Sequence, residues 1–369
     1  TDRSLTIENT SVTTPQVVRF GSIGATAITA NTLKNSIVRN GVNTSSAVVV
    51  TDNAGTAGTF NNITIQNNDI RRAYIGVFTN ATVTAGNGAN LLITQNDLDT
   101  SGANAIRTVG VYVQGADGAT VSSNSIGNFD GGTDEDDTGI WLASGTTNST
   151  VERNTVKNLN YTGTGGYGAH GIKISSAVTN ANDVVKNNFI YGLSGDGYDY
   201  TSASFYADNV FGIFATGGTQ TGVKIYNNSV YLSGNTLDQT NAISAGIAID
   251  SGSSVEVINN AVANDLGRLA GTGYGSVGIW LRSGTAILSA ANNNNYYVNP
   301  TGSGTKAVGQ ISATASTTIT DWQTATGQEG NSISANPLFV SSTDLHLQLV
   351  SGLVGLGTPI GSVTVDYDN

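Results

Sequence analysis

Two short patterns alternate along most of the chain, and they restrict the folds open to it. The first is a glycine followed by two apolar residues with one variable position between them; it starts at Gly76, Gly110, Gly139, Gly171, Gly212, Gly246 and Gly278. The second is an asparagine, a variable residue and an apolar residue; it starts at Asn35, Asn68, Asn96, Asn124, Asn154, Asn188, Asn228 and Asn260, and the run 292–295 continues it. Successive repeat glycines lie 29 to 41 residues apart. A period of this length indicates stacked supersecondary units.

Each repeat contains several segments of four or five residues in which apolar and polar side chains alternate. Such alternation is typical of half-buried strands, and Gly, Asn, Ser and Asp between the segments mark turns. No helical period persists, and the repeat is short for a four-stranded propeller blade. The sequence therefore predicts an all-β solenoid of parallel strands, with one coil per repeat and a rise of about 4.8 Å per coil.

This alternation resembles the right-handed parallel β-helix of the pectate-lyase-like superfamily, over residues from about 20 to 300. The resemblance implies about eight to ten coils, with residues 1–300 as the β-helix and 301–369 as a closing segment of the same domain. It also implies a ladder of stacked asparagines at the turn between the second and third strands of each coil. The residues that match this ladder are Asn35, Asn68, Asn96, Asn124, Asn154, Asn188, Asn228 and Asn260. Asparagine suits such a turn because it tolerates a left-handed backbone.

Composition narrows the partners that we expect. The net charge is −11 and the 15 basic residues are scattered, which argues against nucleic acid as a partner. No apolar run is long enough for membrane insertion. Cysteine is absent, so disulfides and thiolate chemistry are excluded, and methionine is absent even at position 1. The segment 320–348 resembles the end of secreted bacterial β-helix proteins. We therefore expect an extracellular or bacterial cell-surface fragment whose partners include other modules or copies of the parent protein.

The outer side of the first strand of each coil is the expected binding face. Residues one and three positions after the repeat glycine are apolar in nearly every coil and should point inward, so the residue two positions after it should point outward. These outward residues are Phe78, Tyr112, Trp141, Lys173, Phe214, Ala248 and Trp280. An exposed apolar row marks a binding or packing surface. The aromatic members, Phe78, Tyr112, Trp141, Phe214 and Trp280, are candidates for stacking on sugar rings. The alternative is that long loops or the C-terminal tail fold over the row and bury it.

Catalytic candidates on this face are sparse. Four positions after the glycine, Asp250 is the only acid, which argues against a hydrolase that needs two carboxyl groups. Lyases of the superfamily use a Lys or Arg base, so Lys173, with His170 or Arg282 assisting, is the catalytic alternative. His170 precedes a repeat glycine where most coils have an apolar residue, which favours an inward corner position over a general base. His346 lies in the closing segment, where a structural role is expected.

The acidic run 130–137 offers oxygen ligands for Ca²⁺ in Asp130, Asp134, Asp136 and Asp137. It lacks the spacing of an EF-hand loop, and a solvated acidic loop is the competing interpretation. No other cofactor is indicated. Ice binding is a further alternative, but no regular outward Thr-x-Thr row is evident.

The sequence thus favours a non-catalytic module with an adhesive, glycan-contacting or structural role, whose partner is a polysaccharide or a cell-surface glycan. The alternative is a polysaccharide lyase that acts on an acidic glycan with Lys173 as its base.

Overall fold

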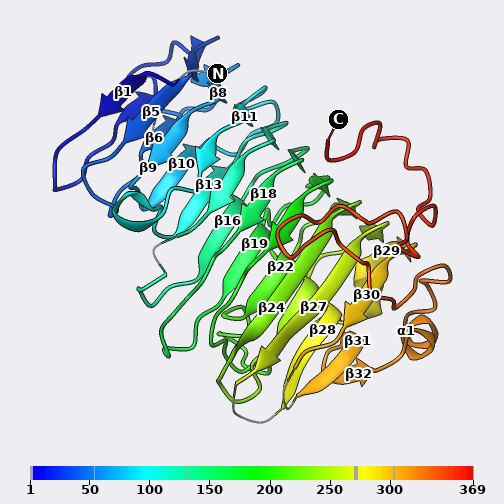
Figure 1. Cartoon of the computed structure of the whole chain (residues 1–369). Helices are drawn as coiled ribbons and strands as arrows, with labels where there is room; N and C mark the ends of the chain where they lie inside the picture. The colour runs from blue at the N-terminus through cyan, green and yellow to red at the C-terminus, as the bar shows by residue number, and fades with distance from the viewer. Residues whose placement is uncertain (1–2, 54, 130, 270–272, 302–303, 369) are drawn as a thin grey trace.

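The chain folds into a parallel β-solenoid of about nine turns, as Figure 1 shows from the blue N-terminal coils to the orange C-terminal ones. The computed structural model describes residues 3–53, 55–129, 131–269, 273–301 and 304–368. Strands account for 41% and helices for 4% of the structure. The predicted all-β solenoid is therefore confirmed.

Three sheets run along the solenoid, and each coil contributes one strand to each sheet in turn. The first sheet contains β2 (Val18–Phe20), β6 (Val48–Thr51), β10 (Ile75–Asn80), β13 (Val109–Gln114), β16 (Asp137–Leu142), β19 (Ala169–Ile174), β22 (Val210–Ala215), β25 (Ser244–Ile249), β28 (Tyr274–Leu281), β31 (Thr305–Ile311) and β32 (Thr314–Ser316). The second contains β4 (Thr32–Lys34), β8 (Thr64–Gln66), β11 (Leu92–Thr94), β14 (Thr120–Ser122), β17 (Thr150–Glu152), β20 (Val184–Lys186), β23 (Lys224–Tyr226), β26 (Val255–Ile258) and β29 (Leu288–Asn292).

The third sheet contains β1 (Leu5–Glu8), β5 (Ser36–Arg39), β9 (Asp69–Arg71), β12 (Asp97–Leu98), β15 (Ser125–Gly127), β18 (Thr155–Lys157), β21 (Phe189–Tyr191), β24 (Ser229–Leu237), β27 (Ala261–Arg268) and β30 (Asn295–Val298). Neighbouring strands in these sheets pair in parallel, except that β32 is antiparallel to β31. A small parallel pair joins β3 (Ile28–Thr29) to β7 (Phe60–Asn61).

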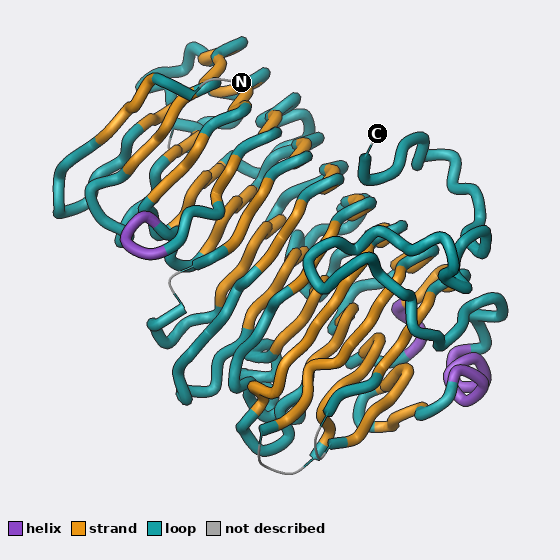
Figure 2. Tube along the Cα trace, in the orientation of Figure 1, coloured by secondary structure: helices purple, strands orange, loops and turns teal. Residues whose placement is uncertain are grey.

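Helical structure is limited, in the part of the chain that the structure describes, to α1 (Ile319–Thr326) and two 3₁₀ turns, Gly102–Asn104 and Thr285–Ile287. Figure 2 shows α1 at the C-terminal end of the stacked strands. Among the described residues, no helix has the length and apolarity that crossing a bilayer requires.

The repeat glycine is explained by a close approach between the first and third sheets. A methyl group added at Gly110 would overlap Ile126 of β15, and one added at Gly171 would overlap Ile190 of β21. The added methyl group at Gly171 would also lie 2.5 Å from the carbonyl oxygen of Gly212. Only glycine lets the backbone approach this closely.

The residue after each repeat glycine forms an apolar stack through the core. Its members are fully buried: Val77, Val111, Ile140, Ile172, Ile213, Ile247 and Ile279. Burying each such side chain stabilises the fold by roughly 1.5–3 kcal/mol. The stack therefore supplies a large part of the stability of a chain that has no disulfides.

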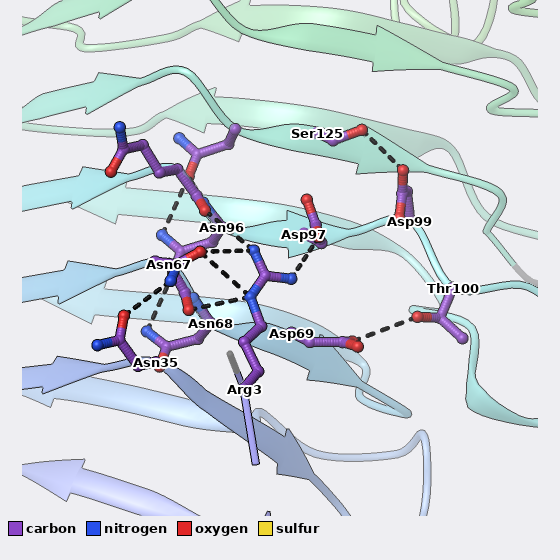
Figure 3. Close-up of polar contacts among 12 residues, drawn as sticks. Arg3, Asn35, Asn67, Asn68, Asp69, Asn96, Asp97, Asp99, Thr100 and Ser125 are labelled. Carbon is purple, nitrogen blue, oxygen red and sulfur yellow. Dashed lines mark hydrogen bonds and ion pairs between the residues drawn. The ribbon is translucent and has the colours of Figure 1, made fainter. Parts of the chain in front are cut away.

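A ladder of buried asparagines links the coils at the turn between the second and third sheets. Asn96 Nδ2 donates to Asn124 Oδ1 at 3.0 Å and to the carbonyl oxygen of Ile65 at 2.9 Å. Asn96 Oδ1 in turn accepts from Asn68 at 3.0 Å (Figure 3). The same bond continues through Asn154, Asn188, Asn228 and Asn260 to Asn294. The expected ladder is confirmed for Asn68, Asn96, Asn124, Asn154, Asn188, Asn228 and Asn260.

Asn35 was predicted to belong to this ladder, and that prediction is wrong. The backbone N–H of Ser36, not of Asn35, donates to Asn68 Oδ1, so Ser36 occupies the ladder position in its coil. Asn35 belongs to an outer row one residue earlier, where Asn67 Nδ2 donates to Asn35 Oδ1 at 2.7 Å (Figure 3). The left-handed backbone also belongs to this outer row: φ is 57° at Asn35 and 52° at Asn67, whereas Asn68 has no positive φ.

The C-terminal end of the solenoid is closed by α1 and the segment that follows it. Trp322 of α1 is fully buried against Gly309 of β31. Asn294, the last asparagine of the ladder, donates to Glu329 at 3.0 Å, and Tyr296 donates to the same carboxylate at 2.9 Å. The buried carboxylate of Glu329 thus accepts hydrogen bonds at the position where a further coil would supply the acceptor.

Candidate functional site

Strand pairing brings the predicted outward residues into one row, which we call the aromatic row. Tyr112 pairs with Phe78 on one side and with Trp141 on the other, and Lys173 follows Trp141. The row continues through Phe214, Ala248 and Trp280. On the N-terminal side it continues through Val49 to Arg19, which is exposed. Residues from many coils therefore form one line across the strands.

The row has an open half and a covered half. Phe78, Tyr112, Trp141 and Lys173 are partly exposed. By contrast, Phe214 and Ala248 have no exposed surface, and Trp280 is 1% exposed. For Phe214 and Trp280, the glycan-stacking prediction is wrong in the described state, and the alternative of a covering loop is correct.

The covering segment is the loop 194–209, which we call the cover loop. Tyr200 and Tyr206 of this loop pack on Trp280, with ring centroids 5.9 and 6.5 Å away. Tyr206 donates to Asp250 at 2.8 Å, and the Arg282 guanidinium lies 3.7 Å from the centre of the Tyr206 ring. These contacts form a second apolar cluster outside the solenoid core.

The open half combines aromatic rings with polar groups that are neutral apart from Lys173 at its end, and we call it the open strip. Its residues are Phe78, Tyr112, Trp141, Lys173, Asn80, Gln114 and Ser175. The hydroxyl of Tyr112 donates to Gln114 at 2.8 Å, and Trp141 Nε1 donates to Ser175 at 2.7 Å. The rings of Phe78 and Tyr112 stack on each other at 5.2 Å, so they present edges and partial faces rather than a flat platform.

Lys173 lies at the end of the open strip, beside two carboxyl groups from the loops that lead into β16 and β22. Its ammonium group is 4.3 Å from the centre of the Trp141 ring and 5.8 Å from that of Phe214. Asp136 and Asp208 are hydrogen-bonded to each other, and Asp136 also accepts from the backbone of Gly168 at 2.8 Å. We call Lys173, Asp136 and Asp208 the closed end.

The closed end has perturbed acidity. Burial and the neighbouring Asp208 charge raise the pKa of Asp136 well above its usual range, and burial raises the pKa of Asp208. Burial lowers the pKa of Lys173, although both carboxylates oppose that change. Two carboxyl groups in hydrogen-bond contact leave no space for the scissile bond, since glycosidase pairs lie about 5–9.5 Å apart. The pair therefore does not have the geometry of either common class of glycosidase.

His170 is not the inward corner residue that the sequence predicted. It lies on the outer side of the sheet, under the cover loop, and its ring stacks on Phe211 at 5.7 Å. Its Nε2 is 2.9 Å from the carbonyl oxygen of Ala207, to which it donates. Burial and the Lys173 charge lower its pKa to about 3, so the ring is neutral near pH 7. Gly171 and Ile172 both face the core, since a methyl group added at Gly171 would meet Ile190 and Ile172 is fully buried, and His170 before them faces outward.

Arg282 does not join Lys173. It forms an ion pair with Asp250 at 2.8 Å, three coils farther along the row and against the cover loop. The proposed lyase set of Lys173, His170 and Arg282 is therefore not assembled: His170 is buried, and Arg282 is paired elsewhere.

The predicted Ca²⁺ ligands do not converge. Asp134 accepts from the Tyr161 hydroxyl at 2.6 Å, Asp136 is in the closed end, and Asp137 is buried at the start of β16. Asp130 lies outside the described residues. Among the residues that the structure describes, no group of three or more acidic or histidine side chains could hold a metal ion.

Sequence reasoning missed Asp208. It lies in the cover loop four residues before Gly212 and has no counterpart at an aligned strand position. The available signal was length, because the 24 residues from Asn188 to Gly212 are the longest such interval between a ladder asparagine and the next repeat glycine.

His346 lies in the C-terminal tail, which returns across the outer asparagine row. Asn259 exchanges two hydrogen bonds with the backbone of Thr358, at 2.7 and 2.9 Å. Tyr367 stacks on Phe189 at 3.7 Å, and His346 lies between Asp344 and Asp368. In Figure 1 the red tail accordingly lies alongside earlier coils.

Comparisons with known proteins do not extend this description. No protein-family model, no curated protein and no solved structure matches the chain.

Proposed function

We propose that this chain is a secreted or bacterial cell-surface module of the pectate-lyase-like superfamily that contacts a glycan through the open strip. The observation that carries the proposal is the line of three partly exposed aromatic residues, Phe78, Tyr112 and Trp141, one per coil. Apolar C–H faces of sugar rings suit the aromatic side chains, and sugar hydroxyl groups suit the amide and hydroxyl groups beside them. A linear glycan lying across the strands would meet one aromatic side chain and one neighbouring polar side chain in each coil. Its role would be adhesive.

The experiment is binding to a glycan array and to immobilised polysaccharides. Tyr112→Ala and Trp141→Ala should each weaken binding about tenfold or more, by the usual cost of losing a buried aromatic contact. The matched control is Tyr297→Ala, because Tyr297 is a partly exposed aromatic residue of β30 in the third sheet, outside the strip and the cover loop. Equal binding by all three variants and the parent would contradict the proposal.

A lyase that uses Lys173 as base remains the second candidate, because burial lowers the pKa of this residue and favours the neutral amine that a base requires. Its test is incubation with acidic polysaccharides, with ultraviolet detection of unsaturated products. Activity that persists in Lys173→Ala would remove Lys173 from this role.

A further inference from the structure

The open strip ends at a built boundary on its C-terminal side. Toward the N-terminal coils, the aromatic row passes the partly exposed Phe78 and the buried Val49 and then reaches the exposed Arg19. Toward the C-terminal coils, it stops at Lys173, because the next residue, Phe214, is fully buried beneath the cover loop. A linear ligand on the row therefore cannot continue past Lys173.

The cover loop is held firmly at this boundary. His170 donates to the carbonyl oxygen of Ala207 at 2.9 Å, one residue before Asp208. Asn209, one residue after it, is fully buried and donates to the carbonyl oxygens of Tyr198 and Tyr206 at 2.9 and 3.1 Å. The cover loop, which forms the wall at the end of the strip, is thus part of the folded structure and not a loose segment.

The polar groups change character at this wall. Along the strip the neighbours of the rings are neutral: Asn80, Gln114 and Ser175. At the wall they are ionisable: Lys173, Asp136 and Asp208 are each partly exposed as residues. The ammonium group of Lys173 and the carboxyl group of Asp136 are largely buried, whereas the carboxyl group of Asp208 is about half-buried. Charge-assisted hydrogen bonds to such groups are stronger than neutral ones.

We propose that the open strip recognises the end of a neutral glycan chain, with the terminal sugar against Lys173, Asp136 and Asp208. This inference rests on the proposed glycan-binding function. A sugar inside a chain would need to continue into the space filled by Phe214 and the cover loop, whereas a terminal sugar stops there. The terminal sugar also carries a free hydroxyl group at the position that is linked to the next sugar in the chain interior. The closed end can bind this hydroxyl group.

The charges favour a neutral ligand over an acidic one. The Asp136–Asp208 pair faces the same space as the single ammonium group of Lys173, so the anionic group of a uronic acid would meet the negative charge of the pair beside its one cation contact. Like charges at close range are repulsive and strongly disfavour a ligand.

The test measures whether binding depends on chain ends. The full chain is titrated with linear neutral polysaccharides, a glucan, a xylan and a mannan, before and after limited cleavage by an endo-acting hydrolase. Binding sites per unit mass of sugar should rise in proportion to the chain ends that cleavage creates, and a cyclic glucan without ends should not bind. A constant number of sites per mass, or equal binding of cyclic and linear glucans, would overturn chain-end recognition while leaving glycan binding intact. Absence of binding to any of these glycans and to the array would instead contradict the proposed function.

Substitution at the wall gives an independent measurement. Asp208→Asn keeps the side-chain shape and a hydrogen bond to Asp136, and it should weaken binding of a linear oligosaccharide about tenfold by removing one charged acceptor. The matched control, Asp134→Asn, alters an exposed aspartate in the same acidic region and should leave affinity unchanged. Unchanged affinity in Asp208→Asn, with a normal unfolding transition, would exclude the closed end from recognition.

Discussion

The carboxyl groups of Asp136 and Asp208 are hydrogen-bonded to each other, although they come from loops that precede two different coils. One loop leads into β16 and the other into β22, with β19 between them in the sheet. This bond joins the cover loop to the solenoid and marks the end of the open strip. It also makes stability depend on pH.

The first prediction concerns that pH dependence. The pKa of Asp136 is raised in the folded state, so the protonated form is favoured there and its stabilising effect is complete below about pH 4. Stability from this pair is lost as the pH rises toward about 7, the folded-state pKa of Asp136. Asp208→Asn removes the repulsion, so it should stabilise the protein by about 1 kcal/mol at pH 8 and have little effect at pH 4.

Urea unfolding at a series of pH values checks this. Asp183, whose pKa burial also raises to about 7, contributes a similar trend to both proteins. The difference between parent and variant therefore isolates the Asp136–Asp208 pair. A difference that does not change with pH would show that the two carboxyl groups do not share a proton.

The second prediction concerns the asparagine ladder. Asn154→Ala removes the acceptor used by Asn124, at 2.9 Å, and the donor that binds Asn188, at 3.0 Å. Both neighbours are buried, so the loss should cost about 3 kcal/mol or more of unfolding free energy. Asn227→Ala in the outer row should cost about 1 kcal/mol, mainly for its left-handed backbone. Equal midpoints in urea would contradict the distinction between the two rows.

The third prediction concerns the repeat glycine. In Gly171→Ala the added methyl group would meet Ile190 and the carbonyl oxygen of Gly212, so we expect a loss of about 2–3 kcal/mol or failure to fold. Gly330→Ala is the matched control, since that position is open and its φ is not positive. Thermal unfolding of both variants provides the comparison, and a Gly171 variant as stable as the control would refute the close-approach explanation.

The fourth prediction concerns the C-terminal tail. Burial alone would lower the pKa of His346, but its hydrogen bond to Asp344 and the charges of Asp368 and Asp344 outweigh this and raise it. At pH values below the unfolded-state pKa of histidine, the charged imidazole stabilises the docked tail. This stabilisation is lost as the pH rises through the higher folded-state pKa. Hydrogen exchange in residues 339–367, corrected for the intrinsic pH effect, should be faster at pH 8 than at pH 5.5. In His346→Gln this difference should disappear; if it persists, another group holds the tail.

The solenoid could be predicted because its causes repeat in every coil. A glycine that permits close sheet packing, an apolar residue after it and an asparagine that bonds the next coil each recur with visible spacing, and together they specified the strands and the line from Phe78 to Trp280. Asn35 was assigned to the wrong row because the outer row also contains asparagines. A shift of one residue along the chain moves a side chain from the buried ladder to the turn at the surface.

The site depended on parts of the chain that do not repeat. Alternation showed that Trp141 and Trp280 point the same way, but only the folded cover loop decided that Trp280 is buried and Trp141 partly exposed. Likewise, nothing in the spacing of Asp136 and Asp208 relates them, because a loop contact depends on how two insertions pack and not on a period. Local repetition therefore determined the framework, while long-range packing of its loops decided which of its surfaces a ligand can reach.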